Sequence, residues 1–166
     1  MKRIVLAFTL VTLLVTSCTT DADDNTIEGI WTLTEWNISE GFDIDGDGVT
    51  NRNILNEIEC VNNETLVFES NGTVTSKNTF NPNITIALLN GTSNDYVFDV
   101  ACDEIGVISF ASTFTINGNQ VLINDGVATL NGDTLSCIFV DAIKIYNEAY
   151  TEVVATKDLI LVYTHR

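Results

Sequence analysis

The sequence predicts an all-β protein: an antiparallel up-and-down barrel of about eight strands, with a short helical turn after the first strand. The chain has one proline, and the strand-favouring residues valine, isoleucine, threonine and phenylalanine recur in short runs. Asn-Gly and Asp-Gly pairs separate many of these runs, and such pairs favour the tight turns of β-hairpins. A long meander of strands must curl or close, and closure removes exposed edges, so a barrel is favoured over an open sandwich.

The strands follow one another with little chain between them. The first is expected within residues 27–38, where alternation places Trp31 and Leu33 on one face and Trp36 on the other. A short helical turn is expected within residues 53–59. Further strands are expected within residues 64–80, 83–92, 95–102, 107–140, 142–147 and 158–166, divided by turns at Asn71-Gly72, Asn117-Gly118, Asp125-Gly126 and Asn131-Gly132.

The N-terminus has the form of a bacterial lipoprotein signal peptide, residues 1–17. Two basic residues precede an apolar run, residues 4–15, that is too short to span a bilayer as a stable helix. Small residues before Cys18 resemble the lipobox, in which the cysteine is lipidated and becomes the new N-terminus; the alternative is a plain signal peptide with an unrelated cysteine. Residues 18–26 are polar and acidic, which predicts a flexible tether ahead of one domain, residues 27–166.

The predicted location is the bacterial cell envelope, as an outer-membrane lipoprotein held to the membrane by its lipid and exposed at the cell surface. Acidic residues just after Cys18 resemble the export signal by which some Gram-negative bacteria send lipoproteins to the surface. The chain carries 23 acidic and 7 basic residues, a formal net charge of −16 at pH 7. That charge repels nucleic acid and anionic headgroups and favours divalent cations, so nucleic-acid binding is excluded as a function class.

The order of motifs resembles the lipocalin-like domains of bacterial surface lipoproteins. Those domains open on a Gly-x-Trp strand, continue with an acidic Asp-Gly loop and a cysteine, and close on a strand of the form Asp-Leu-x-Leu-Val-Tyr. The matching residues are Gly29, Trp31, Asp43, Asp45, Asp47, Gly48, Cys60, Glu64, Phe68, Cys102 and residues 158–163. The resemblance covers residues 26–166 and implies a barrel of about eight strands in which Trp31 packs at the closed base. It implies no ligand, because fold does not specify function.

The segment GFDIDGDGVTNRNI, residues 41–54, is the one stretch whose residues suggest a chemistry. Calcium takes about six to eight oxygen ligands, and an Asp-x-Asp-x-Asp-Gly loop folds three carboxylates around one point while the glycine turns the chain back. The sequence therefore predicts a calcium site with the ligands Asp43, Asp45, Asp47, the carbonyl of Val49, Asn51 and Glu57.

One position departs from that pattern, because Ile54 stands where a bidentate acid is usual. The missing carboxylate is expected from Glu57 or Glu59 if the next turn folds back, with Asn53 as a substitute. A site built in this way should be weak, with a dissociation constant of about 10⁻⁴ to 10⁻³ M, and its role is expected to be structural. Magnesium is disfavoured by its demand for tight octahedral geometry. The alternative is an acidic turn whose charges are merely solvated.

Three cysteines remain after Cys18. Cys60 and Cys102 both lie at strand ends beside acidic stretches, and the family that the chain resembles carries the same pair. A Cys60–Cys102 disulfide is therefore expected, as suits an oxidising compartment. The alternatives are three free thiols or a pairing through Cys137. Cys137 alternates with apolar residues and is expected to be a small buried side chain.

An enzyme is not expected. The sole histidine, His165, is next to last in the sequence, and no glycine-flanked serine nucleophile, His/Cys zinc cluster or phosphate loop occurs. Two function classes remain: a barrel that binds a small apolar or amphiphilic ligand, or a non-catalytic structural or interaction module of an outer-membrane assembly with a filled barrel. Inward-facing residues that would line a cavity or fill a core are Ile84, Ile86, Phe98, Phe110 and Phe114, so no ligand-binding residue can be assigned.

Overall fold

The computed structural model describes residues 27–102 and 109–166; the signal peptide, Cys18 and the tether lie outside this part of the chain. The elements are β1 (Gly29–Phe42), β2 (Asn51–Asn53), a 3-10 helix η1 (Ile54–Asn56), β3 (Thr65–Phe68), β4 (Thr73–Lys77), β5 (Asn83–Leu88), β6 (Tyr96–Ala101), β7 (Ala111–Asn117), β8 (Gln120–Ile123), β9 (Gly126–Asn131), β10 (Thr134–Tyr146) and β11 (Val153–His165). The turn η1 is the predicted helical turn after the first strand.

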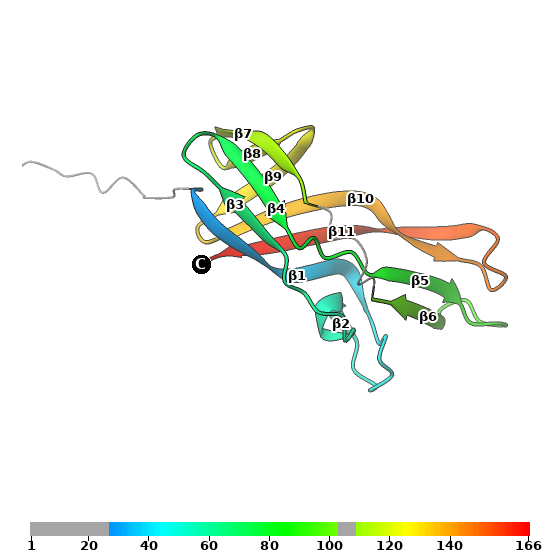
Figure 1. The fold of residues 1–166 in the computed structure, drawn as a ribbon. Coiled ribbons are helices and arrows are strands. Elements are labelled where there is room, and N and C mark those ends of the chain that lie inside the picture. The colour runs from blue at the N-terminus through cyan, green and yellow to red at the C-terminus, as the bar shows by residue number, and fades with distance from the viewer. Residues whose placement is uncertain (1–26, 103–108) are drawn as a thin grey trace, which may run out of the picture.

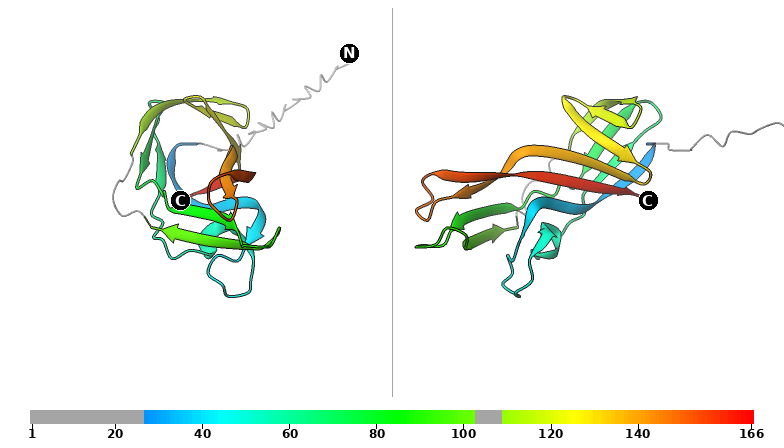
Figure 2. Two further views of the ribbon diagram at one scale, coloured as in Figure 1. Left: turned by 90° about the vertical axis from the view of Figure 1, so that its right-hand side faces the viewer. Right: turned by 180° about the vertical axis from the view of Figure 1, so that it is seen from behind.

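Eight strands form a closed antiparallel barrel, which confirms the predicted fold class. Around the ring the order is β1, β3, β4, β7, β8, β9, β10 and β11, and the ring closes because β11 pairs with both β10 and β1. The left panel of Figure 2 shows this ring from one end. Among the described residues, no helix is long and apolar enough to cross a membrane.

The strands β1, β10 and β11 continue beyond the barrel into a second, sheet-like part, on the right of Figure 1. There the β5–β6 hairpin joins β10 through a parallel pairing, with Ile145 opposite Ile86. The short β2 pairs with β1 along the edge of β1 that faces away from β11, with Asn51 opposite Phe42. The up-and-down pattern therefore holds for the barrel, while the hairpin is a branch that the sequence did not predict.

Most predicted turns are where the sequence placed them. Gly72, Gly118 and Gly132 adopt φ values of +81°, +61° and +56°, in the left-handed region that glycine enters without strain. Between β8 and β9 the left-handed residue is Asn124, with φ +52°, immediately before the predicted Asp125-Gly126 pair. Asparagine tolerates this conformation, so the hairpin forms with the turn one residue earlier.

Residues 134–146 form one strand, whereas the sequence predicts two separate strands here. Asp141 interrupts the pairing as a bulge with φ +55°, but the strand continues past it. The backbone N–H of Asp141 donates to the Asp158 carboxylate at 3.0 Å, and the Thr156 hydroxyl donates to the Asp141 carboxylate. These contacts with β11 hold the bulge in place and keep the two halves of β10 in one strand.

The opening Gly-x-Trp motif has a direct steric cause. Trp31 is 1 % exposed, and its indole N–H donates to the Ile27 carbonyl at 2.7 Å. The ring of His165 lies 4.8 Å from the Trp31 ring. Gly29 adopts φ +128°, and a Cβ there would lie 2.4 Å from the His165 imidazole nitrogen. Glycine at this position lets the first and last strands of the domain approach so closely, and His165 has a packing role beside Trp31.

Two hydrophobic clusters hold the fold. The larger lies inside the barrel and contains Ile27, Trp31, Leu33, Leu66, Phe68, Val74, Phe80, Val121, Ala128, Leu130, Leu135 and Tyr163. The smaller lies in the sheet-like part and contains Ile38, Phe42, Ile54, Ile86, Ile145 and Leu159. Trp36 packs against both clusters, so it joins the barrel to the extension that carries the acidic loop.

Candidate functional site

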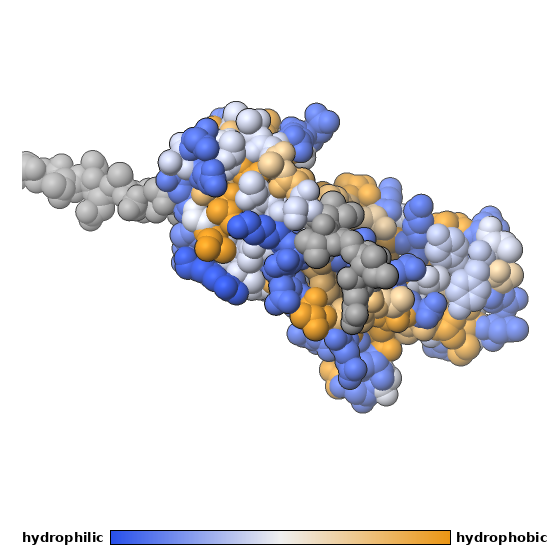
Figure 3. All heavy atoms as spheres, viewed as in Figure 1, coloured by the Kyte–Doolittle hydropathy of each residue, from blue (hydrophilic) through white to orange (hydrophobic). Residues whose placement is uncertain are grey.

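The acidic loop connects β1 to β2 and projects from the lower side of the molecule in Figure 1. Hydrophilic side chains dominate its surface in Figure 3. The hairpin is tight at its base, since a Cβ at Gly41 would lie 2.8 Å from the carbonyl carbon of Asn51. Gly46 and Gly48 adopt φ values of +76° and +86°, which side chains rarely allow. The glycines therefore set the path of this loop.

The loop folds around its own carboxylates. The Gly48 N–H donates to Asp43 Oδ2 at 3.0 Å. The Asp47 N–H donates to Asp45 Oδ1 at 3.1 Å, and the Val49 N–H donates to Asp47 Oδ1 at 2.7 Å. Each aspartate thus holds a backbone amide further along the loop, and these contacts curl the chain.

Glu57 returns to this loop from the end of η1. Asn53 caps η1: its side-chain oxygen accepts from the Leu55 N–H at 3.2 Å and from the Trp36 N–H at 2.9 Å. The turn directs Glu57 back, where its Oε2 accepts from the Ile44 N–H at 2.7 Å. Glu57 is only 3 % exposed, although it is an acid. A buried carboxylate needs partners, and the loop supplies them.

Three carboxylates converge at this point. Asp43, Asp45 and Glu57 each offer an oxygen, and these oxygens all lie within 4.8 Å of one another. Asp43 Oδ1 is buried and has no hydrogen-bond partner. Three acceptors so close together repel one another unless a cation lies between them. Hard oxygen ligands of this kind suit calcium, so the donor set fits the expected ion.

The other predicted ligands are placed differently. The Asp47 carboxylate holds the Val49 amide and is outside the group of three. The Asn51 side-chain amide donates to Glu57 Oε1, so Asn51 positions the acid from the side. Ile54 is 0 % exposed in the smaller hydrophobic cluster and offers no ligand. Glu59 is exposed and outside the cluster, so of the two acids weighed for the missing position, the fold brings Glu57.

A second acid, Glu64, is buried inside the barrel, at a position where the sequence predicts no site of its own. Glu64 is 4 % exposed; its Oε1 accepts from the Tyr163 hydroxyl at 2.6 Å and its Oε2 from the Phe80 N–H at 2.7 Å. Burial raises the pKa of Glu64 above its usual value, and burial beside Glu64 raises the pKa of Tyr163. The available signal was alternation: Glu64 shares a face with Leu66 and Phe68, which point inward.

Glu64→Gln is expected to change how stability depends on pH. Because the pKa of Glu64 is raised on folding, the folded state favours its protonated form, and stability is lost as pH rises from the unfolded pKa through the folded pKa. Glutamine cannot ionise, so the variant should gain stability relative to the native chain as pH rises over this range. Urea unfolding of both proteins at several pH values measures the difference; a constant difference would contradict the assigned burial cost.

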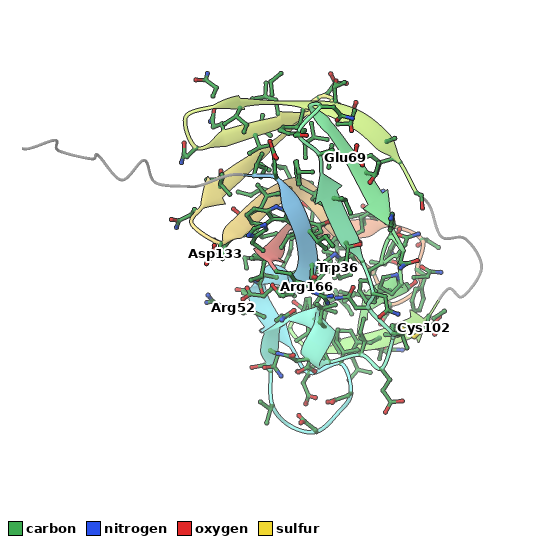
Figure 4. The ribbon with its side chains drawn as sticks, turned by 60° about the vertical axis from the view of Figure 1, so that its left-hand side comes forward. Trp36, Arg52, Glu69, Cys102, Asp133 and Arg166 are labelled. Carbon is green, nitrogen blue, oxygen red and sulfur yellow. A yellow bond between two sulfur atoms is a disulfide. The ribbon has the colours of Figure 1, made fainter. Side chains whose placement is uncertain are left out.

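The interior of the barrel is packed with side chains. Val74, Val121 and Leu135, from three different strands, are each 0 % exposed, so water has no access to them. Trp36, labelled in Figure 4, lies among the side chains inside the ring of strands. Two of the residues expected to line a cavity or fill the core lie elsewhere: Ile86 is fully buried in the smaller cluster outside the barrel, and Phe110 is 39 % exposed. The interior of the barrel around Val74, Val121 and Leu135 is therefore packed like a protein core.

The predicted disulfide between Cys60 and Cys102 is present. It fastens the segment after η1 to the end of β6, where Figure 4 labels Cys102. Cys137 is the free cysteine of the described residues, and it packs half-buried against the barrel core. Burial raises the pKa of its thiol to about 11, so it is un-ionised and unreactive at neutral pH.

Comparisons of the chain with protein-family models, with curated protein sequences and with solved structures gave no significant match. The resemblance to lipocalin-like domains consequently rests on the sequence motifs alone.

Proposed function

We propose that the chain is an envelope-anchored lipoprotein whose lipocalin-like barrel is a non-catalytic structural or interaction module, with a calcium ion ordering the loop between β1 and β2. The observations that carry the calcium site are the convergence of the Asp43, Asp45 and Glu57 carboxylates and the buried oxygen of Asp43 that has no hydrogen-bond partner. Lipidation of Cys18 would hold the module at the outer membrane, in a medium rich in divalent cations.

The proposed role of calcium is structural. Ile44 in the loop packs against the smaller hydrophobic cluster, and Ile54 in η1 belongs to it. An ion that holds Asp43 and Asp45 to Glu57 would therefore fix the loop against this core. Without the ion, repulsion among the three carboxylates works against the same packing. Calcium would supply positive charge and flexible coordination, while Asn51 and the Ile44 amide orient Glu57.

Calcium is expected to raise the thermal stability of the protein. If the dissociation constant is about 10⁻⁴ M, about 10 mM calcium adds about 2.7 kcal/mol and raises the melting temperature by several degrees relative to EDTA. Asp43→Asn should abolish most of this shift, because it removes charge at the buried end of the site. Calorimetric melting in EDTA and in calcium measures it.

Asp125→Ala is a matched control, since Asp125 is an exposed acid of an Asp-Gly pair in another turn. That variant should keep the full calcium effect. The calcium site would be contradicted by equal melting temperatures with and without calcium, or by an equal loss of the calcium-induced shift in both variants. The loop would then be a solvated acidic turn.

A carrier of small apolar molecules is the second candidate. Partly buried aromatic residues support it, because Trp36, Tyr96 and Phe98 pack around the smaller cluster without being fully enclosed. The packed interior of the barrel favours the structural or interaction module instead. We therefore expect no saturable binding of the apolar dye N-phenyl-1-naphthylamine. Saturable fluorescence that a fatty acid displaces, and that Trp36→Ala weakens, would favour the carrier.

A further inference from the structure

A tyrosine is held in a strained conformation at the far end of the sheet-like part, in the turn between β10 and β11. Tyr150 adopts φ +58°, a left-handed conformation that bulky residues rarely enter. Asn147 holds the turn: its carbonyl accepts from the Tyr150 N–H at 2.9 Å, and its side-chain oxygen accepts from the Thr151 N–H at 2.9 Å. Glycine would fit this position freely, yet the chain presents an aromatic ring there that is 50 % exposed.

The ring borders a hollow of about 220 Å³, lined by Thr85, Tyr146 and Tyr150. The hollow lies on the outer face of the sheet, because Ile84 and Ile86, on either side of Thr85, face the smaller hydrophobic cluster. It is at the end of the molecule formed by β5, β6 and the β10–β11 turn, on the right of Figure 1. Neither of the two proposed functional features, the acidic loop or the barrel interior, includes these residues.

Charged residues of both signs lie on the strands next to the residues that line the hollow. Asp99 on β6 is directly opposite Thr85 in the antiparallel pairing. On the other side, β10 pairs with β5 in parallel, with Tyr146 opposite Ala87, and the exposed Lys144 lies two residues before Tyr146 on the same face of the strand. Lysine supplies hydrogen-bond donors, aspartate supplies acceptors, and the hydroxyls of Thr85 and the tyrosines supply both. The outer face thus carries aromatic rings together with hydrogen-bond donors and acceptors.

We propose that this hollow binds a single neutral sugar residue. A sugar ring has C–H groups that can pack against the face of Tyr150, and hydroxyls that both donate and accept hydrogen bonds, which matches the polar groups around Thr85. The volume is below the range of about 300 Å³ and more that larger ligands occupy, so it suits one ring. The net charge of −16 disfavours an anionic ligand. The strain at Tyr150 is then the cost of presenting its ring.

The proposal is tested by nuclear magnetic resonance with the methyl glycosides of glucose, galactose, mannose and N-acetylglucosamine, each added to the purified protein to about 50 mM. At least one glycoside should shift the amide signals of Thr85, Tyr146 and Tyr150 in a saturable manner. Tyr150→Gly should weaken that binding about two- to tenfold, the effect of losing one stacking contact. The melting temperature of this variant should not fall, because glycine fits the left-handed backbone.

Asn124→Gly is the matched control, since it changes another left-handed residue, with φ +52°, to glycine in the β8–β9 turn. Its sugar affinity should equal that of the native protein. No saturable shift with any glycoside, or equal affinity in Tyr150→Gly and the native protein, would overturn the proposal. Tighter binding of tetramethylammonium than of every glycoside would also overturn it and assign the hollow to organic cations.

The source of the sugar is distinguished by comparing the best methyl glycoside with the corresponding free reducing sugar. Equal or tighter binding of the methyl glycoside indicates a sugar linked within a glycan, because the methyl group occupies the position of the next residue. Binding of the free sugar alone indicates a soluble monosaccharide.

Discussion

Replacing both Cys60 and Cys102 with serine is expected to lower the free energy of unfolding by about 4 kcal/mol. The disulfide joins residues separated by 42 positions, and a cross-link of that length removes substantial freedom from the unfolded chain. It also fastens the segment after η1, next to the acidic loop, to the end of β6. Urea unfolding of the double variant and of the native protein measures the loss.

The native protein in a reducing agent is the control, and it should lose the same stability as the double variant. Both serines are introduced together so that no single thiol is left to form other pairs. A loss below about 1 kcal/mol in both cases would mean that the bridge adds little to the packing already present.

Phe68→Ala is expected to cost about 3–5 kcal/mol, through lost burial and the cavity that remains. Phe68 is 2 % exposed, and its ring centroid lies 6.4 Å from that of Trp31 and 5.0 Å from that of Phe114. The ring therefore joins β1, β3 and β7 across the barrel interior. Denaturant unfolding measures the change in stability.

Phe139→Ala is the matched control, because Phe139 lies on β10 and is 49 % exposed. Exposed substitutions of this kind usually change stability by about 0.5 kcal/mol or less. Equal losses from both variants would contradict a packed barrel, since they would mean that the interior position is no better enclosed than the surface.

The strands and turns could be predicted because their signals are local. Alternation identifies the inward faces of β3 and β9, and Asn-Gly pairs identify the hairpins. Closure depends on β1 pairing with β11, where Trp31 lies opposite His165. No local residue pattern predicts this contact between the two ends of the domain. Closure of the barrel was predicted only because a closed barrel has no open strand edges. The β5–β6 branch was missed because its parallel pairing with β10 leaves no turn signal.

The acidic site was predictable to the extent that its spacing is local. Asp43, Asp45 and the glycine path of the loop follow from the Asp-x-Asp-x-Asp-Gly pattern. The choice of Glu57 over Glu59 depends on η1 and its Asn53 cap, which set the direction in which the chain returns. That direction depends on packing against the smaller hydrophobic cluster. The sequence alone therefore did not decide between Glu57 and Glu59 as the additional ligand.

Local alternation places Glu64 on the inward face of its strand, but it does not identify the partners that a buried acid needs. An acid is usually exposed, and Glu64 is tolerated inside because the Phe80 N–H and the Tyr163 hydroxyl, which is 99 positions away in the sequence, both donate to it. The strained Tyr150 was likewise hidden, because its backbone conformation is imposed by Asn147 within the finished turn.

The most direct measurement of the central claim is a calcium titration followed by amide signals in nuclear magnetic resonance. The Gly48 amide donates to Asp43, and the Ile44 amide donates to Glu57, so both report on the proposed ligands. We expect saturable shifts concentrated in residues 43–57, with a dissociation constant of about 10⁻⁴ to 10⁻³ M, and their loss in Glu57→Gln. Shifts that spread over the acidic surface without saturating, or none at the Gly48 amide, would contradict the calcium site.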